Sequence, residues 1–492
     1  MAVPETLKQY LPERGLEIKE ISGYYYVYKY SAKKLSSGKW GKSSGQCIGK
    51  VVEGKGFIPN KSYKADELFA SVDEITVLEY GQYGLIYTVA APVLKKLEQY
   101  FKVDVASQIF SYAALIYANG FIHVDQVNSF YQQSWLSLKN KKLGISMGRT
   151  AISTLLDDLA RKGTRVHNYE KSMIADCITG NAKIAIDGHG IRSMSDENDF
   201  AETGYKFKEL KADQINLLMG YDVEKGIPLF AKLFRGSAID KSTIEDLDKI
   251  YDFKNILFII DRGFFSTDNL NIFSKNGCTF IIPLPANTNE FKKAMNDLSY
   301  TGEFMYRAGK KHTRVQYMER VLSDGRRVIV YKDTEENERT RFNYLRSIDQ
   351  GKAGYTQEEY EKNKDLFGVI VLFTNTSLSP EEVFCNYKKR WSIETFYQFL
   401  KNTTDFNNLK IEDYYKEQGL AFIMLITGQI HHYVELSVKK LQDNTTSIYD
   451  ALTMARFMKI NLIKKKWHLC NTRKKDLERL KVMGFEPTPV VA

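Results

Sequence analysis

Four polar side chains recur at helical spacing between positions 387 and 401. At intervals of three, four and seven residues come Tyr387, Arg390, Glu394 and Lys401. At roughly 100° per residue they fall within about a 60° arc of an α-helix, so one narrow face carries a phenol, a guanidinium, a carboxylate and an ammonium. The carboxylate can hold a divalent cation while the other three groups bind a phosphate backbone. The alternative is a solvated surface helix with an Arg390–Glu394 ion pair.

Two aspartates follow apolar runs that predict buried strands. The segment KIAID ends on Asp187 and breaks at Gly188. The segment NILFIID ends on Asp261, and its continuous apolar run is typical of a strand buried on both faces. Because ligand sites in α/β sheets lie at strand ends where connections diverge, we expect the two carboxylates to lie close together. For a lone aspartate, a strand-end turn or a helix cap is the simpler explanation.

Together with Glu394, these aspartates supply three carboxylates. Neighbouring carboxylates raise each other's pKa unless a cation lies between them. Hard oxygen ligands favour Mg²⁺ or Mn²⁺ over zinc. Three of them can hold two ions about 3.5–4 Å apart, as in-line phosphoryl displacement requires. Two other candidates nearby, Asp240 and His189, are interpreted as a helix cap and a neutral loop histidine.

An α/β core has to bring these segments together. Further strands are expected at 215–221, 227–234 and 278–284, with a helix at 241–251. The helix that carries Glu394 is expected to open at Ser379 or Pro380 and to run without interruption to Asn402. Between Asp261 and Glu394 lie 132 residues, more than a helix and a strand need. Positions 300–332 alternate like a hairpin, 355–367 favour a helix, and GVIVLFTN favours a strand, which together predict a β-rich insertion.

The basic residues of this insertion suit phosphate contact, although a solvated β-meander would have the same composition. They are Arg307, Lys310, Lys311, Arg314, Arg326 and Arg327.

The flanking regions have different patterns. Positions 24–30, 47–52 and 74–80 favour strands, and a lysine-rich turn follows the first of them. This aromatic and basic surface can stack and bind a nucleic acid, or it is a tyrosine-rich hairpin with a solvated loop. Positions 91–176 have helical periodicity, and 139–163 resemble half of a helix-turn-helix or, equally, an αα-hairpin. Beyond position 410 the chain is expected to be helical and basic, for DNA contact, dimerisation or simple solvation.

Composition limits the class of protein. The 492 residues include 43% apolar residues, which excludes general disorder, and carry a formal net charge of +10, which permits nucleic-acid binding. Five cysteines without a CxxC pair indicate reduced thiols in a cytoplasm and argue against a zinc site. The first residues lack the apolar core of a secretory signal. The longest apolar run, 419–430, is too short to cross a bilayer and predicts a buried helix.

Several pieces of the sequence together resemble one family. They are IAIDG, QINLLMGYDVEKGIPL, IIDRGFF and the pattern Y-x2-R-x3-E-x6-K with RWSIE inside it. Over about residues 180–410 the chain resembles the DDE transposases of bacterial insertion sequences, in the group marked by this Tyr-Arg-Glu-Lys signature. The resemblance implies a metal-binding triad of Asp187, Asp261 and Glu394 on an RNase H-like sheet. It also implies phosphate contacts at the cleaved DNA end, for which we expect Tyr387, Arg390 and Lys401, with Lys389 and Trp391 beside them.

The predicted fold is an α/β protein with an RNase H-like mixed-sheet catalytic core at 177–290 and 366–415 and a β-rich insertion at 291–365. The other regions are a β-rich segment at 1–90 and a helical segment at 91–176, both candidates for DNA binding, and a helical basic region at 416–492.

The predicted function is that of a DNA transposase. It would bind the terminal inverted repeats of its insertion sequence, cut with two divalent ions (Mg²⁺, with Mn²⁺ able to substitute), and join the 3′-OH ends to target DNA. The expected partners are double-stranded DNA and a second copy of the chain, with no membrane, in a bacterial cytoplasm and at the nucleoid when bound to DNA. Two alternatives stay open: a two-metal nuclease of the same fold without strand transfer, and a catalytically silent DNA-binding protein derived from such an element.

Overall fold

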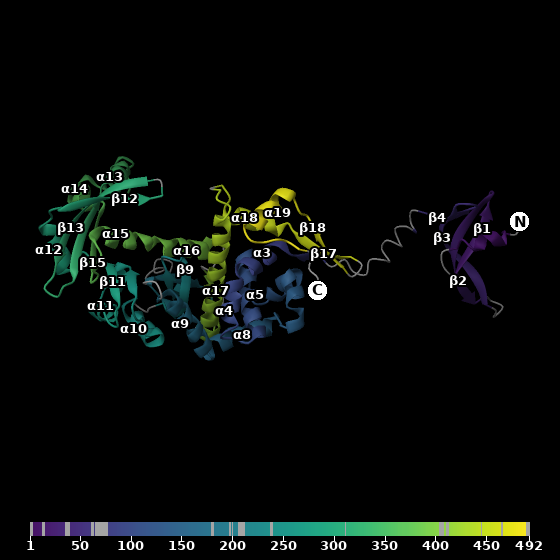
Figure 1. Cartoon of the computed structure of the whole chain (residues 1–492), viewed down its shortest axis with the longest axis horizontal. Coiled ribbons are helices and arrows are strands. Elements are labelled where there is room, and N and C mark those ends of the chain that lie inside the picture. The colour runs from purple at the N-terminus through teal and green to yellow at the C-terminus, as the bar shows by residue number, and fades with distance from the viewer. Residues whose placement is uncertain are drawn as a thin grey trace. The chain divides into compact units, whose positions relative to one another are not determined.

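A computed structural model describes most of the chain. The described residues are 3–11, 15–34, 40–60, 63, 77–178, 182–195, 198, 200–204, 212–236, 240–309, 311–402, 408–409, 413–443, 445–463 and 466–488. They form two compact units, which are treated separately (Figure 1). The first unit comprises Met1–Leu78, Lys459–Cys470 and Thr488–Val491, and the second Glu79–Met458, Asn471–Pro487 and Ala492.

The first unit is built on a four-stranded antiparallel sheet. After the short helix α1 (Glu5–Lys8), its strands follow chain order as β1 (Leu16–Ile21), β2 (Tyr24–Lys34), β3 (Trp40–Val52) and β4 (Gly56–Pro59). Ser22 and Gly23 have positive φ, as the two-residue turn between β1 and β2 requires. Leu7, Val27 and Ile48 are buried in its core. The strand prediction is confirmed, while the lysine-rich turn at 35–39 and positions 74–76 lie outside the described residues.

A second sheet contains strands from far along the chain. Its order is β18 (Lys466–Cys470), β17 (Lys459–Ile463) and β5 (Val77–Glu79). The expectation of a purely helical region after 416 is therefore wrong for Lys459–Cys470. Strand pairing is a non-local interaction that helical periodicity does not reveal, and Asn471 with φ 56° ends the hairpin.

In the second unit, helices surround one long buried helix. Those from the first part of the chain are α3 (Gly81–Val89), α4 (Ala91–Leu97), α5 (Val103–Asn119), α6 (Val127–Gln133), α7 (Trp135–Lys139), the 3₁₀ turn η1 (Lys141–Leu143), α8 (Arg149–Arg161) and α9 (Thr164–Ile178). The long helix is α17 (Tyr414–Lys439), followed by α18 (Ile448–Arg456) and α19 (Lys474–Val482). α17 packs on α5 and α8 on one side and on the sheet strand β9 (Ile227–Arg235) on another (Figure 1).

Two predictions about these helices can be compared with the structure. Residues 419–430 lie within α17 and are buried, as expected, and no helix among the described residues is long and apolar enough to cross a membrane. α8 buries Leu155 and Leu156 and packs on α17 so closely that a Cβ at Gly419 would lie 2.1 Å from the Leu156 carbonyl oxygen. This packing makes α8 part of the helical layer around α17.

The core of the second unit is a mixed sheet. Strand β6 (Lys183–Ser193) pairs antiparallel with β8 (Asp213–Asp222), and β8 pairs antiparallel with β9. On its other side β6 pairs parallel with β10 (Leu257–Ile260), which pairs parallel with β11 (Thr279–Pro283). The order β9-β8-β6-β10-β11, with α10 (Asp240–Tyr251), η3 (Arg262–Phe264) and α11 (Thr267–Ile272) in the connections, is that of an RNase H-like core, as predicted. Two short strands, β7 (Glu202–Thr203) and β16 (Asn408–Leu409), pair with β8 and β6.

The predicted insertion extends this same sheet. After α12 (Asn289–Asn296) come β12 (Gly302–Ala308), β13 (Lys311–Val321) and β14 (Arg327–Asp333), and β15 (Val369–Thr374) joins them to β11. Between β14 and β15 lie α13 (Thr334–Asp349), α14 (Gln357–Asn363) and the 3₁₀ turn η4 (Lys364–Leu366). α13 was not expected, although Asp333 caps it by accepting a hydrogen bond from the Glu336 amide. The insertion strands and the core strands thus belong to one continuously hydrogen-bonded sheet.

Two expected boundaries are wrong, and both concern the candidate site. β6 does not end at Asp187 but continues through His189 to Ser193, because β8 pairs with it along its whole length. The expected single helix is two: α15 (Pro380–Lys389) and α16 (Trp391–Asn402). At the junction, the Arg390 amide donates to the Tyr387 carbonyl and the Ile393 amide donates to the Arg390 carbonyl. These are i→i−3 hydrogen bonds, as in a 3₁₀ turn, in place of the i→i−4 bonds of an α-helix.

Candidate active site

The sheet register places the two aspartates side by side. In the parallel pair of β6 and β10, Ile186 is the partner of Ile260, so Asp187 and Asp261 are the next residues on neighbouring strands. Asp187 remains within β6, whereas Asp261 leaves β10 with extended backbone and begins η3. Both side chains therefore stand at one end of the parallel part of the sheet.

The third carboxylate arrives on α16. A capping box between Ser379 and Glu382 begins α15, as the sequence predicts. After the break, α16 buries Ile393 and Phe396 against the core, with exposures of 0% and 4%, and leaves Glu394 half-buried in its first turn. α16 contacts β6, the strand that carries Asp187.

Arg390 lies between the strand and the helix. Its Nη2 is 2.5 Å from Oε1 of Glu394, and its Nη1 is 3.7 Å from Oδ2 of Asp187. The guanidinium also lies 5.8 Å from the centre of the Tyr387 ring. With only 14% of its side chain exposed, Arg390 is the cation of a buried cluster and not one half of a solvated surface pair.

The pKa shifts show how crowded this cluster is with negative charge. Burial raises the pKa of Asp187 to about 6; Asp261 and Glu394 add to the rise, and Arg390 and the Gly188 amide oppose it. Burial also raises the pKa of the Tyr387 phenol, with further contributions from Asp261 and Glu394. Burial lowers the pKa of Arg390, but Tyr387 and the acidic neighbours outweigh it and hold the guanidinium charged. Three carboxylates share one cation.

The arrangement fits divalent ions chemically but is closed by Arg390. Among the described residues, no three acidic, histidine or cysteine side chains are gathered closely enough to hold an ion. The donors are hard carboxylate oxygens, of the kind that Mg²⁺ or Mn²⁺ prefers, and they outnumber the one cation that pairs with them, Arg390.

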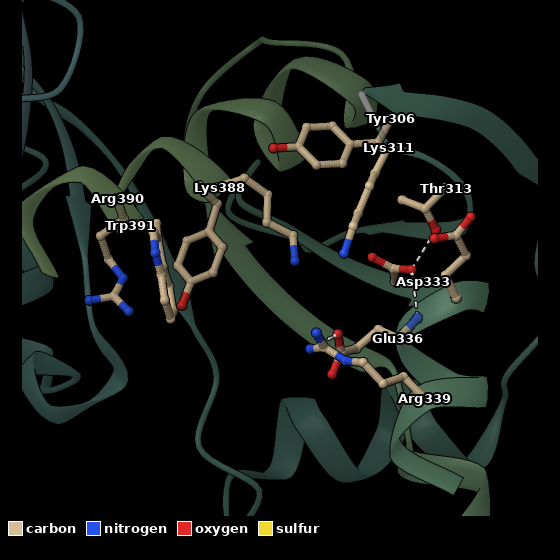
Figure 2. A pocket seen from close by; sticks show the side chains of 11 residues that line it. Tyr306, Lys311, Thr313, Asp333, Glu336, Arg339, Lys388, Arg390 and Trp391 are labelled. Atoms are coloured by element: carbon tan, nitrogen blue, oxygen red, sulfur yellow. Dashed lines mark hydrogen bonds and ion pairs between the residues drawn. The ribbon is translucent and has the colours of Figure 1, made fainter. Parts of the chain in front are cut away.

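A cavity of about 690 Å³ adjoins the cluster and connects it to the insertion (Figure 2). Its lining residues are Tyr306, Lys311, Thr313, Asp333, Glu335, Glu336, Arg339, Tyr387, Lys388, Arg390 and Trp391. Figure 2 shows Tyr306 and Lys311 of the insertion facing the space that Arg390 and Trp391 line from the opposite side. Trp391 is 64% exposed, so its ring forms an open wall of the cavity.

Several cavity residues were missed by sequence reasoning. Tyr306 and Arg339 have no fixed spacing from the signature. The pairing of β12 to β14 with the core brings Tyr306 near it, and Arg339 lies on α13, which follows β14. Lys388 carried a usable signal, because it lies one turn before Trp391 at helical spacing.

Two predicted cations lie elsewhere. Lys389 is exposed and pairs with Glu224 at 2.5 Å, and Glu224 also pairs with Lys183 at 2.7 Å. Lys401 is half-buried in the last turn of α16, two turns beyond Glu394, and makes no ion pair within the described part of the chain.

Most basic residues of the insertion are already paired. Arg314, Arg326 and Arg327 form ion pairs with acids of the same β-meander, whereas Lys311 lines the cavity. Lys310 lies outside the described residues.

His189 differs from its interpretation as a loop residue. It belongs to β6, is 5% exposed, and its ring lies 5.3 Å from that of Tyr397 on α16. It therefore helps to pack the helix on the strand.

Comparisons with known proteins bear on the family of this chain. A search of curated proteins found no match. A solved structure described as a piggyBac transposase synaptic complex with hairpin DNA is similar to this chain at 12% identity and a TM-score of 0.40, covering 83% of this chain and 85% of that chain. The family model described as "Transposase DDE domain" matches residues 179–427, half of the chain and the whole segment between Asp187 and Glu394. The chain belongs to the transposase DDE domain family.

Proposed function

We propose that this chain is a DNA transposase of the bacterial insertion-sequence type. The observation that supports the proposal is the register that sets Asp187 and Asp261 on neighbouring strands, together with the ion pairs of Arg390 with Asp187 and Glu394. The family match covers all three carboxylates. In this proposal the chain acts in a bacterial cytoplasm on the inverted repeats at the ends of its own element.

The proposed reaction has two steps at one site. Water attacks the phosphorus at the element end, the P–O3′ bond breaks, and the 3′-OH leaves. The freed 3′-OH then attacks a target phosphodiester, forms a new P–O3′ bond and releases the target 3′-OH. Two divalent ions, when bound, supply a Lewis acid and a water of lowered pKa. No covalent protein–DNA bond is needed, so the Tyr387 phenol is not a nucleophile.

The chain's own residues bind and orient the substrate. Asp187 and Asp261 would hold the ions on the sheet, and Glu394 would complete their ligand set. Arg390, released from the carboxylates, and Lys401 would neutralise phosphate charge, while Tyr387 donates a hydrogen bond to it.

The cavity suits an unpaired nucleotide of the DNA end. Its volume lies in the range of small-molecule sites, and Tyr306 and Trp391 offer aromatic faces for a base. Lys311, Arg339 and Lys388 offer charge for the adjoining phosphates, partly offset by three acids that line the same wall. An opened hairpin or a base turned out of the duplex has this chemistry.

Longer-range binding would use cations outside the cluster. Lys389, exposed beside the signature, adds to phosphate attraction along the duplex. The first unit, with its aromatic strand β2, and the helices around α8 are the candidates for reading the inverted repeat, and two copies of the chain would hold the two ends.

The test uses the full-length protein with duplexes from the DNA that flanks its own gene. With Mg²⁺, we expect nicks at the element ends and joined products, and pre-cleaved ends should join to target DNA. Asp187→Asn, Asp261→Asn and Glu394→Gln should abolish both products, while Tyr387→Phe should still cut.

Each other result of this assay would indicate a different kind of protein. Cutting without joining of pre-cleaved ends would indicate a two-metal nuclease. DNA binding without either product would indicate a silent DNA-binding protein. Loss of cutting in Tyr387→Phe with cutting retained in Glu394→Gln would indicate a tyrosine recombinase.

A further inference from the structure

Tyr397 connects the helix of Glu394 to the strand of Asp187 by one hydrogen bond. Its hydroxyl donates to the main-chain carbonyl oxygen of Asp187 at 2.6 Å, across 210 residues of sequence. Tyr397 is 5% exposed, and this bond reaches the very residue of β6 that carries the first carboxylate. It is not part of the signature, and in the sequence it looks like one more aromatic residue of a buried helix face.

The bond is made at the position where β6 no longer has β10 as a neighbouring strand. β10 ends at Ile260, the partner of Ile186, so from Asp187 onward β6 has no residue of β10 beside it. The Tyr397 hydroxyl supplies a side-chain partner at the first position past that end. The strand is thereby held where it carries the carboxylate.

The same side chain fixes the rotation of α16. Tyr397 follows Glu394 by three residues, so the two lie on one side of the helix, about 4.5 Å apart along its axis. On β6, Asp187 and His189 are two residues apart and share one face of the strand. The Tyr397 ring packs on the His189 ring at 5.3 Å, so α16 crosses the face of β6 that presents the Asp187 carboxylate.

Tyr397 adds a directional contact beyond the junction at which α15 ends and α16 begins. The capping box at Ser379 fixes the start of α15, and two i→i−3 hydrogen bonds at Arg390 mark where the second helix begins. Other contacts of α16 with the core, such as Phe396 against Tyr221, are apolar and non-directional, whereas Glu394 itself is ion-paired with Arg390. The apolar contacts hold the helix on the core and the Arg390 pair holds the Glu394 carboxylate, while the Tyr397 bond ties the helix to the backbone of Asp187.

We propose that Tyr397 is a positioning residue for the carboxylate site, setting the distance of Glu394 from Asp187 and thereby the affinity for divalent ions. The inference rests on the proposed function for its purpose, and on the Tyr397–Asp187 bond for its geometry. Tyr397 does not touch substrate; it acts through Glu394 and Asp187.

The test compares two tyrosine hydroxyls that make the same kind of bond. Tyr397→Phe removes the bond to Asp187. Tyr331→Phe removes the bond of a buried tyrosine to the Pro380 carbonyl oxygen, 2.7 Å long, at the far end of α15. Mn²⁺ binding to the full-length protein is measured without DNA, by calorimetry and by the electron paramagnetic resonance signal of free Mn²⁺, alongside the melting temperature in EDTA.

We expect Tyr397→Phe to weaken Mn²⁺ binding by about 10–100-fold, as for other residues that orient metal ligands. Tyr331→Phe should leave Mn²⁺ affinity within about twofold, while both variants lose a comparable, small amount of thermal stability. Replacing Tyr397 with 4-aminophenylalanine, which keeps a donor at the same place, should restore most of the affinity. This rescue keeps the test decisive if Tyr397→Phe is poorly folded.

Unchanged Mn²⁺ affinity in folded Tyr397→Phe, or an equal loss in both variants, would overturn the proposal and leave Tyr397 as a core residue. The proposed function fails by a different result, namely wild-type protein that binds Mn²⁺ but neither cuts nor joins DNA.

Discussion

At the scale of single residues, the cluster is built for binding at the expense of stability. Asp187 is half-buried near two other carboxylates, and Arg390 alone cannot neutralise all three. Strained electrostatics of this kind is common where a protein keeps a place for ions that are not its own side chains. The free energy of unfolding should therefore rise when the charge is removed.

Asp187→Asn is expected to stabilise the protein in EDTA at pH 7.5 while abolishing cleavage. The carboxyl has a pKa of about 6 in the folded state against 3.8 as its ordinary value, so the folded state binds more protons between these values. Stability then falls as pH rises through this window, and the penalty is complete above pH 6. The order of magnitude is about 1–3 kcal/mol.

The measurement is thermal unfolding at pH 7.5 and pH 4, where the gain should shrink. Asp297→Asn, in an exposed pair with Arg320, is the control and should show no gain. A lower melting temperature for Asp187→Asn at pH 7.5 would contradict the prediction.

Substitutions of the adjacent cations Arg390 and Lys389 should have different effects, because the two side chains lie in different surroundings. Arg390→Ala removes the cation that pairs with Asp187 and Glu394 and should reduce cleavage by at least about 100-fold at saturating DNA. Lys389→Ala, whose side chain pairs with Glu224, should weaken binding by a similar factor on every duplex and lower the salt slope by about 1. Single-turnover cleavage and fluorescence anisotropy at several salt concentrations distinguish them; equal losses of cleavage would refute the assignment.

Many of the candidate site residues could be predicted because their positions follow simple strand and helix periodicities. Asp187 and Asp261 follow apolar runs, and the signature follows the helical repeat. Tyr397 could not be singled out, because an aromatic residue on a buried helix face is ordinarily core, and its partner is a backbone atom that no sequence pattern marks.

At the scale of elements, some helices and strands follow from local sequence signals, and others depend on tertiary packing. The capping box of α15, the strands of the core and the buried α17 could all be predicted. The break at Arg390 could not, since no Gly or Pro marks it; it accompanies the burial of the guanidinium between Asp187 and Glu394. α13 was missed because it is largely exposed and lacks an apolar stripe, with Asn337 its only buried residue.

The contact of α16 with α17 should be sensitive to one methyl group. A Cβ at Gly428 would lie 2.3 Å from Cζ of Phe396, so Gly428→Ala should push α16 and cost about 1–3 kcal/mol of stability. Because α16 carries Glu394, Mn²⁺ affinity should fall as well.

Gly419→Ala is the matched control, since it crowds Leu156 on α8 from the same helix α17. It should lower the melting temperature by a similar amount and leave Mn²⁺ affinity unchanged. If both variants bind Mn²⁺ like the wild type, α16 is not positioned by this contact.

At the scale of the whole molecule, the chain order does not match the spatial order. The insertion strands extend the core sheet, and Lys459–Cys470 belongs with the N-terminal residues in the first unit. Such long-range pairing depends on register and edge complementarity, which a single sequence does not reveal. The RNase H-like order itself was predictable, because each core strand has its own apolar pattern.

Deletion of residues 1–60 should separate end recognition from chemistry. The sheet β1–β4 has its own core, so its removal should leave Mn²⁺ affinity and the main unfolding transition within a few degrees of the full chain. DNA-end affinity should fall, and preference for the inverted repeat over random duplex should be lost. Anisotropy with both duplexes measures this; an unchanged preference would place recognition in the second unit.

The position of Asp187 in the middle of β6, paired with β8 on both sides of it, sets which kinds of genetic change this site tolerates. Neighbouring positions can exchange one apolar residue for another with little harm. Loss or gain of a single codon between 183 and 187 would instead turn the carboxylate to the opposite surface of the sheet, since side chains alternate along a strand. Variation in length should therefore be confined to the connecting loops, and in-frame libraries of the gene should show an abrupt gap at this strand.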